Sequence, residues 1–354
     1  MGCLPLYPPL ELFHSLDLVP VVLWGFDGLK DGVSESDKHI QNYVCSVARR
    51  LTEFVLIDGR NLLDGLFMYN ACDTLRNLPE ILECGLGDQG ISIPLLNIHI
   101  PAMSKKQTDG SKYLEGEITS LISKLEQEYG VTYSEKKFME SADLYREMRS
   151  LSLELEKLTA SGIIGFRDFV RIIHKQYFMP VDVQVASLRS CIKKYGSLSA
   201  GKNFSEGKKN VVLSGILPPP SSICDILEKS DFTVTGNDIA SLYRSYCYHP
   251  QITGDAREYY INFYQNHFPC TTLLSTSDSR VKAIINLIRE RKAHGFIFIG
   301  EKFCEYEYLE IPFVDKILKD EGIHTLHLEF SIDDNENTEA FRTRIESFAE
   351  AMNG

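Results

Sequence analysis

Short apolar runs alternate with amphipathic stretches in two separate regions of the chain, and this alternation limits the possible fold more than any other feature. The runs of the first region are Val19–Trp24, Leu63–Tyr69 and Ile91–Ile100. Those of the second region are Val211–Leu217, Phe232–Val234, Gly295–Ile299 and His324–Phe330. Buried strands joined by crossover helices form parallel sheets. The sequence therefore predicts an α/β protein with two open, parallel-sheet, Rossmann-like domains.

Amphipathic helices are expected between these strands. Apolar side chains recur at near-helical spacing from His39 to Leu56, which predicts one helix that contains Cys45. The segments Val281–Lys292 and Thr338–Met352 show the same kind of pattern in the second region. Each of these helices has one apolar face to pack against a sheet.

A long charged segment separates the two regions. Its amphipathic pattern, clearest from Lys112 to Lys157, predicts a helical insert. The polar, Gly- and Lys-rich stretch Ser199–Lys209 is typical of a linker. Three parts are therefore predicted: an N-terminal α/β domain over residues 1–108, the helical insert and linker over 109–206, and a C-terminal α/β domain over 207–354.

Charge and cysteine content limit the class of protein. A formal net charge of −12 disfavours nucleic acid and anionic membranes as partners, since both require basic surfaces. No apolar run reaches the roughly 20 residues that cross a bilayer, and the start of the chain lacks the pattern of a signal peptide, so a cytoplasmic location is expected. Nine cysteines then indicate reduced thiols or metal ligands rather than a disulfide framework.

Two cysteines stand at positions that suit chemistry. Cys72 and Cys304 each follow a predicted buried strand and each precede an acidic residue, although the two spacings differ. Ligands collect beyond the carboxyl ends of parallel strands, where a helix N-terminus stabilises a thiolate. Without a C-x-x-C pair, any metal site must be built from distant cysteines. The cysteines interpreted as ordinary thiols are Cys84, Cys191, Cys224 and Cys247.

Six segments, in order, give nearly the whole chain a resemblance to a known family. They are Pro5–Leu12, Tyr43–Arg49, Asn70–Leu78, Ser214–Ile216, Gly300–Glu305 and Thr343–Phe348. In these segments the chain resembles the 2-hydroxyacyl-CoA dehydratases and ATP-dependent benzoyl-CoA reductases, and specifically their cluster-binding subunits.

The resemblance implies a cofactor and its ligands. In the proteins that the chain resembles, three cysteines hold a 4Fe-4S cluster and one iron is left without a protein thiolate. Carried over residue by residue, the ligands are Cys45, Cys72 and Cys304, while Cys270 resembles a further family position and is a tentative additional ligand. A related branch of the family holds a double-cubane 8Fe-9S cluster. Ile239 stands where that branch has another cysteine, which favours the single cubane.

The resemblance also implies an activity. The chain is expected to be the iron-sulfur component of a low-potential acyl-CoA dehydratase or reductase, with anaerobic radical chemistry on the acyl-CoA. Its electrons would come from a separate ATP-hydrolysing iron-sulfur activator protein. The absence of a G-x-x-x-x-G-K-S/T loop agrees with ATP hydrolysis by another protein. A homologous second subunit or a self-dimer is the further expected partner.

Two alternatives stay open at this point. One is a double-cubane-type reductase of small molecules, and the other is a non-catalytic partner or maturation subunit. His14 and His267 have the chemistry of proton donors near neutral pH, and Arg244 has that of a CoA phosphate contact, but a structural role is preferred for each. No catalytic residue is therefore predicted.

Overall fold

The computed structural model describes residues 1–25, 32–101, 108–197, 207–273, 275–332 and 338–352. Their contacts group the chain into two units. The first unit comprises Met1–Glu147, Tyr177–Pro180 and Tyr248–Ser275, and the second comprises Met148–Gln176, Val181–Cys247 and Thr276–Gly354. The chain therefore passes from one unit to the other after residues 147, 176, 180, 247 and 275. The predicted boundaries at residues 108 and 206 stay a prediction, because this grouping follows contacts rather than single stretches of sequence.

The first unit contains a sheet in which every strand pairs in parallel, in the order β2-β1-β3-β4. The strands are β1 (Gly2–Cys3), β2 (Val21–Val22), β3 (Leu66–Tyr69) and β4 (Leu95–Ile98). Strands β2, β3 and β4 lie within the three apolar runs that predicted them. Strand β1 is not predicted, because two residues carry no periodicity that a sequence pattern can reveal.

Helices of the first unit come from both ends of its sequence. They are α1 (Leu10–Ser15), α2 (Ser46–Ile57), α3 (Asp73–Asp88), α4 (Thr108–Tyr129) and α10 (Ala256–Asn266), with the 3₁₀ turns η1 (Ser36–Lys38), η2 (Gly59–Asn61) and η3 (Thr271–Leu273). Helix α2 packs against α3, and α4 packs against α10. The long helix α5 (Glu135–Ala160) contributes its first half to this unit and its second half to the other.

The predicted helix from His39 to Leu56 is wrong at its start. Regular α-helix begins only at Ser46, and Cys45 is the N-cap residue of α2, with extended backbone angles of φ −56° and ψ 147°. The Glu53 carboxylate on α2 accepts the backbone N–H groups of Glu35 and Ser36 at 2.8 Å each. These bonds hold the preceding chain in the η1 turn, so the apolar spacing before Cys45 does not continue the helix.

A buried carboxylate joins α1 to α10 in the first unit. Glu11 is 1% exposed and accepts hydrogen bonds from the phenol groups of Tyr259 at 3.1 Å and Tyr260 at 2.8 Å. The Tyr260 hydroxyl in turn accepts the Leu12 backbone N–H at 3.1 Å. Because a buried carboxylate requires such donors, the unit depends on residues separated by almost 250 positions.

The second unit contains another parallel sheet, in the order β6-β5-β7-β8. Its strands are β5 (Lys209–Gly215), β6 (Phe232–Ile239), β7 (Gly295–Glu301) and β8 (His324–Phe330). In both sheets the first strand of the chain lies between the second and the third, and the fourth strand lies beside the third. The two units thus share one strand order, which the alternation in the sequence does not reveal.

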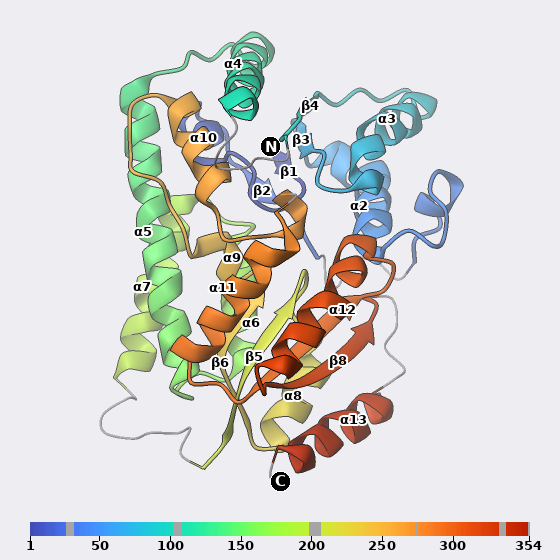
Figure 1. Cartoon of the computed structure of the whole chain (residues 1–354). Coiled ribbons are helices and arrows are strands. Elements are labelled where there is room, and N and C mark those ends of the chain that lie inside the picture. Colours follow the sequence, from blue (N-terminus) through green and yellow to red (C-terminus); the bar gives the residue numbers. More distant parts are fainter. Residues whose placement is uncertain (26–31, 102–107, 198–206, 274, 333–337, 353–354) are drawn as a thin grey trace. The chain divides into compact units, whose positions relative to one another are not determined.

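Helices lie against both faces of the second sheet (Figure 1). The helices of the second unit are α6 (Phe166–Gln176), α7 (Val181–Gly196), α8 (Ser221–Lys229), α9 (Tyr243–Tyr246), α11 (Ser277–Glu290), α12 (Glu305–Asp320) and α13 (Thr338–Ala351), with the second half of α5. Residues of α11 and α12 form one buried cluster with Val212, Phe296 and Phe298 of the sheet. On the other face, Phe348 of α13 stacks on Phe232 of β6 with ring centroids 5.9 Å apart.

The predicted fold class is confirmed, since two all-parallel sheets with helices between their strands make an α/β protein. Residues 109–197 of the predicted insert are almost entirely helical, in α4, α5, α6 and α7. Most of the predicted linker Ser199–Lys209 lies outside the described residues. Across the described ranges, no helix is both long and apolar enough to cross a membrane.

Candidate functional site

Cys72 lies at the carboxyl end of the first sheet. Strand β3 ends at Tyr69, and Cys72 follows three residues later as the N-cap of α3. Its sulfur accepts the backbone N–H of Leu75 at 3.5 Å, so the thiol takes the role that a serine or aspartate side chain has at other helix starts. The side chain is partly exposed. Cys72 therefore presents its sulfur at the positive end of a 16-residue helix.

Cys304 occupies the corresponding place in the second sheet. Strand β7 continues to Glu301, and Cys304 follows three residues later as the N-cap of α12, another helix of 16 residues. The apolar run in the sequence ends at Ile299, which makes the two strand-to-cysteine spacings look unequal. Measured from the ends of the actual strands, they are the same.

The shared strand order explains why this place suits a ligand. In a sheet where the first strand lies between the second and the third, the connections leave the first and third strands in opposite directions and open a crevice at their carboxyl ends. Cys72 follows the third strand of the first sheet, and Cys304 follows the third strand of the second. Each thiol thus stands at the switch point of its own sheet.

Cys45 is the third cysteine at an α-helix start. It is the N-cap of α2 and is partly exposed. Of the nine cysteines in the sequence, Cys45, Cys72 and Cys304 are the ones that the structure places as N-caps of α-helices. The residues of the set predicted from the family resemblance therefore share one position, the start of an α-helix.

Cys270, the tentative ligand, is fully buried among hydroxyl groups. Its sulfur receives a hydrogen bond from the Tyr7 phenol at 3.4 Å and lies 3.1 Å from the Thr272 hydroxyl. The Tyr69 phenol at the end of β3 lies close to both Cys270 and Cys72, and burial is the main cause that raises the pKa of Tyr69. Cys270 thus neighbours the Cys72 segment within the first unit, and its role as a ligand stays a prediction.

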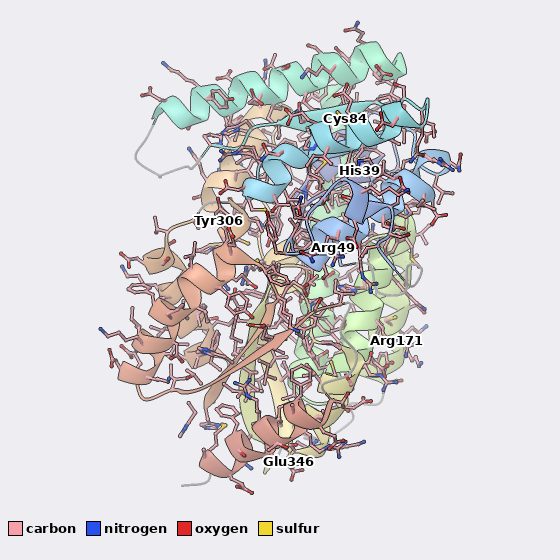
Figure 2. All side chains as sticks on the ribbon, turned by 90° about the vertical axis from the view of Figure 1, so that its right-hand side faces the viewer. His39, Arg49, Cys84, Arg171, Tyr306 and Glu346 are labelled. Atoms are coloured by element: carbon pink, nitrogen blue, oxygen red, sulfur yellow. The ribbon has the colours of Figure 1, made fainter. Side chains whose placement is uncertain are left out.

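The remaining cysteines have no such placement. Burial raises the pKa of the Cys3 thiol to about 12, does the same for Cys224, and raises that of Cys247 further still. With pKa values raised this far, the three thiols stay protonated and act as small apolar groups. Cys84 is an exposed residue on α3 (Figure 2), and Cys191 lies on α7.

Sequence reasoning missed a buried carboxyl group beside Cys304. Glu307, in the first turn of α12, is 1% exposed and donates its backbone N–H to the Cys304 carbonyl at 3.2 Å. Burial raises the pKa of its carboxyl to about 7, against the opposing effect of Arg280 and Arg244. A glutamate near a helix start is common on exposed surfaces, so no pattern in the sequence distinguishes this buried one.

The residues weighed as proton donors or phosphate contacts have structural partners. Arg244 is fully buried and pairs with Asp238 at 2.6 Å, so its guanidinium is not available to a CoA phosphate. His14 Nδ1 lies 2.8 Å from the Ser141 hydroxyl, and His267 Nδ1 lies 2.9 Å from the Phe268 carbonyl. These contacts agree with the structural roles preferred for all three.

A sequence model of the family described as "2-hydroxyglutaryl-CoA dehydratase, D-component" matches residues 5–352 of the chain. The chain belongs to this family. Similar relatives of this D-component family member include the (R)-phenyllactyl-CoA dehydratase beta subunit of Clostridium sporogenes, which is 25% identical over 99% of the chain and 91% of the relative. The (R)-2-hydroxyglutaryl-CoA dehydratase subunit beta of Acidaminococcus fermentans is 24% identical over 99% and 92%. A benzoyl-CoA reductase subunit of Thauera aromatica is 22% identical over 87% and 79%.

The predicted ligands of this D-component family member are divided between its units. Cys45 and Cys72 belong to the first unit, and Cys304 belongs to the second. Among the residues that the structure describes, no group of three or more His, Cys, Asp or Glu side chains is arranged to hold a metal ion.

Proposed function

We propose that the chain is the iron-sulfur subunit of an electron-activated acyl-CoA dehydratase or reductase, in which Cys45, Cys72 and Cys304 bind a 4Fe-4S cluster. The observation that carries the proposal is their common placement as N-caps of α-helices. Membership of the dehydratase family and the acyl-CoA enzymes among the relatives support the reaction class. A cytoplasmic location belongs to the same proposal.

The donor set fits such a cofactor chemically. Iron-sulfur clusters are held by cysteine thiolates, and the positive end of a helix stabilises a thiolate. The three proposed ligands are partly exposed, in contrast to Cys3 and Cys224, whose burial keeps them protonated. When bound, the cluster would supply a low-potential electron and one iron open to substrate, while the protein fixes orientation and excludes water.

The protein groups around these thiols have roles of their own in the proposal. The Leu75 N–H holds the Cys72 sulfur in place, and hydrogen bonds to sulfur raise the potential of a bound cluster. The Tyr7 phenol donates to the Cys270 sulfur in the same way, and the Thr272 hydroxyl lies 3.1 Å from that sulfur. In this proposal Cys270 is either a fourth cysteine that contacts the cluster or a buried neighbour that excludes water from it.

Partners follow from the relatives as part of the proposal. Two of the named relatives are beta subunits, and the third is a subunit of a benzoyl-CoA reductase, so this chain is proposed to act with a homologous second subunit. Its electrons are proposed to come from an ATP-hydrolysing iron-sulfur activator. An acyl-CoA thioester is the proposed substrate, and dehydration and reduction are both consistent with the relatives' names.

The test is anaerobic purification of the chain, followed by iron and sulfide analysis and electron paramagnetic resonance. We expect the same loss of iron and signal in Cys45→Ser, Cys72→Ser and Cys304→Ser. Two controls, Cys84→Ser on the exposed side of α3 and Cys191→Ser on α7, should retain the wild-type iron content.

Three results would redirect the proposal. Full iron content in any of the three N-cap variants would remove that cysteine from the ligand set. A loss in Cys270→Ser equal to that in Cys72→Ser would add Cys270 to the set. A protein with no iron after anaerobic purification, and with none taken up on reconstitution, would favour the non-catalytic partner or maturation subunit.

A further inference from the structure

A single buried guanidinium near the start of α11 contacts four groups of the second unit. Arg280 is 3% exposed. It donates to Glu310 at 2.7 Å, to the Ser214 hydroxyl at 3.1 Å and to the Asp238 carboxylate at 3.2 Å. It also lies 3.8 Å from the Glu307 carboxylate. One side chain thus joins the ends of β5 and β6 to the first two turns of α12.

The sheet side of this cluster is held by a second arginine. Arg244 donates through Nε to Asp238 at 2.6 Å, and its terminal nitrogen donates to the Asp238 backbone carbonyl at 2.6 Å. The Ser214 hydroxyl donates to the same carboxylate at 2.9 Å. Asp238 is therefore a fixed point at the carboxyl end of β6, against which Arg280 holds the helix.

The helix side of the cluster begins next to the proposed ligand. Glu307 donates its backbone N–H to the Cys304 carbonyl at 3.2 Å, and its carboxylate accepts the Ile216 backbone N–H at 3.2 Å. Glu310 stands one turn further along α12. Arg280 thus holds the helix turn that follows Cys304 through two side chains, Glu307 and Glu310.

Stability alone is a weak explanation for such a cluster. Removing charges from water costs so much that well-packed apolar residues often stabilise a fold as well as a buried ion pair does. What the charges provide is one defined geometry, because a planar guanidinium donates its hydrogen bonds only in fixed directions. At the start of α12, the contacts of Arg280 fix the position of Cys304, which is a cluster ligand in the proposed function.

We propose that Arg280 is a positioning residue for Cys304. It holds the N-terminal turn of α12 against the ends of β5 and β6, and so fixes the direction in which the Cys304 thiol is presented. This inference rests on the proposed function, because a fixed thiol direction matters most if Cys304 binds iron. Its test uses the thiol itself and does not depend on iron.

The experiment measures the alkylation of Cys304 in the full chain. The protein is freed of iron with a chelator under anaerobic, reducing conditions and treated with iodoacetamide, and each modified peptide is followed by mass spectrometry. Cys72 in the same chain is the internal reference. We expect Arg280→Lys, which keeps the charge but loses the fork, to raise the rate of Cys304 relative to Cys72 about tenfold, as for the loss of one charge-assisted hydrogen bond.

The matched control is Arg291→Lys. Arg291 pairs with the buried Glu156 at 3.1 Å in the same unit, so the same substitution disturbs another ion pair. We expect that variant to leave the alkylation ratio unchanged. In iron-loaded protein, Arg280→Lys should also alter the electron paramagnetic resonance signal, and Arg291→Lys should not.

Equal alkylation ratios in the two variants would overturn the inference. If Arg280→Lys does not fold, Glu310→Gln removes the nearer of the two ionic partners on α12 and leaves the guanidinium in place. An unchanged ratio in that variant would overturn the inference as well. Failure of the proposed function looks different: Cys304→Ser would then keep the iron content of the wild type, or the wild type would bind no iron, whatever the alkylation ratios show.

Discussion

Replacement of Glu156 by glutamine should remove a large part of the pH dependence of stability. Glu156, on α5, is 2% exposed, and it accepts hydrogen bonds from the Tyr246 phenol at 2.7 Å and from Arg291 at 3.1 Å. Burial raises the pKa of its carboxyl to about 7 from the ordinary value of 4.5, against the opposing effects of Arg291 and Tyr246. The folded protein therefore holds a proton there that the unfolded chain releases.

The sign and size of the effect follow from proton linkage. Between pH 4.5 and about 7 the folded state binds more protons at Glu156 than the unfolded state does, so stability falls as the pH rises through this window. One pKa unit corresponds to about 1.4 kcal/mol, so the loss across the window is about 3 kcal/mol. Glutamine has nearly the same shape and no charge. The free energy of unfolding of Glu156→Gln, measured relative to that of the wild type, should therefore increase by about 3 kcal/mol between pH 4.5 and pH 7.5.

The assay is equilibrium unfolding in urea at several pH values between 4.5 and 8, for wild type and variant side by side. The control is Glu154→Gln, the same substitution at an exposed position of the same helix, which should follow the wild-type curve. The burial of Glu307 affects all three proteins equally and cancels in the comparison. Parallel curves for wild type and Glu156→Gln would refute the reasoning.

Three further changes test packing in the two units by urea unfolding at constant pH. Gly300→Ala would place a methyl group 2.6 Å from the Tyr308 hydroxyl, and we expect this overpacking to lower the free energy of unfolding by about 1–3 kcal/mol. An unchanged midpoint of urea unfolding would contradict this. Phe67→Ala empties a fully buried site in β3 and should cost about 3–5 kcal/mol, so a loss below 1 kcal/mol would show that the site collapses. Tyr7→Phe removes the hydroxyl that donates to the Cys270 sulfur and should cost about 1 kcal/mol, with faster alkylation of Cys270; equal alkylation would count against that hydrogen bond.

The sequence predicts the sheets well because strand formation follows local periodicity. The run His324–Phe330 coincides with β8, and the run Gly295–Ile299 lies within β7. The predicted helix around Cys45 is less accurate, because apolar spacing cannot show that Glu53 binds two backbone N–H groups ahead of the helix. Helix starts depend on such contacts with distant side chains, and the periodicity of a window does not contain them.

The candidate site is predicted only in part for the same reason. A strand followed by a cysteine is visible in the sequence at Cys72 and Cys304, and the family resemblance adds Cys45. The equal spacing from strand end to cysteine at Cys72 and Cys304 appears only in the structure, where β7 extends to Glu301. The cluster around Arg280 could not be predicted, because its members come from two strands and two helices and each is an ordinary polar or charged residue in its own stretch of sequence.

The first unit is built from separate stretches of the chain, and this affects how it can fold during synthesis. Its sheet is complete by residue 98, but the phenols that bind Glu11 lie at residues 259 and 260. Domains usually fold as they leave the ribosome, the N-terminal one first. Here Glu11 must wait for α10, so nearly three quarters of the polypeptide has emerged before the buried carboxylate can receive its donors.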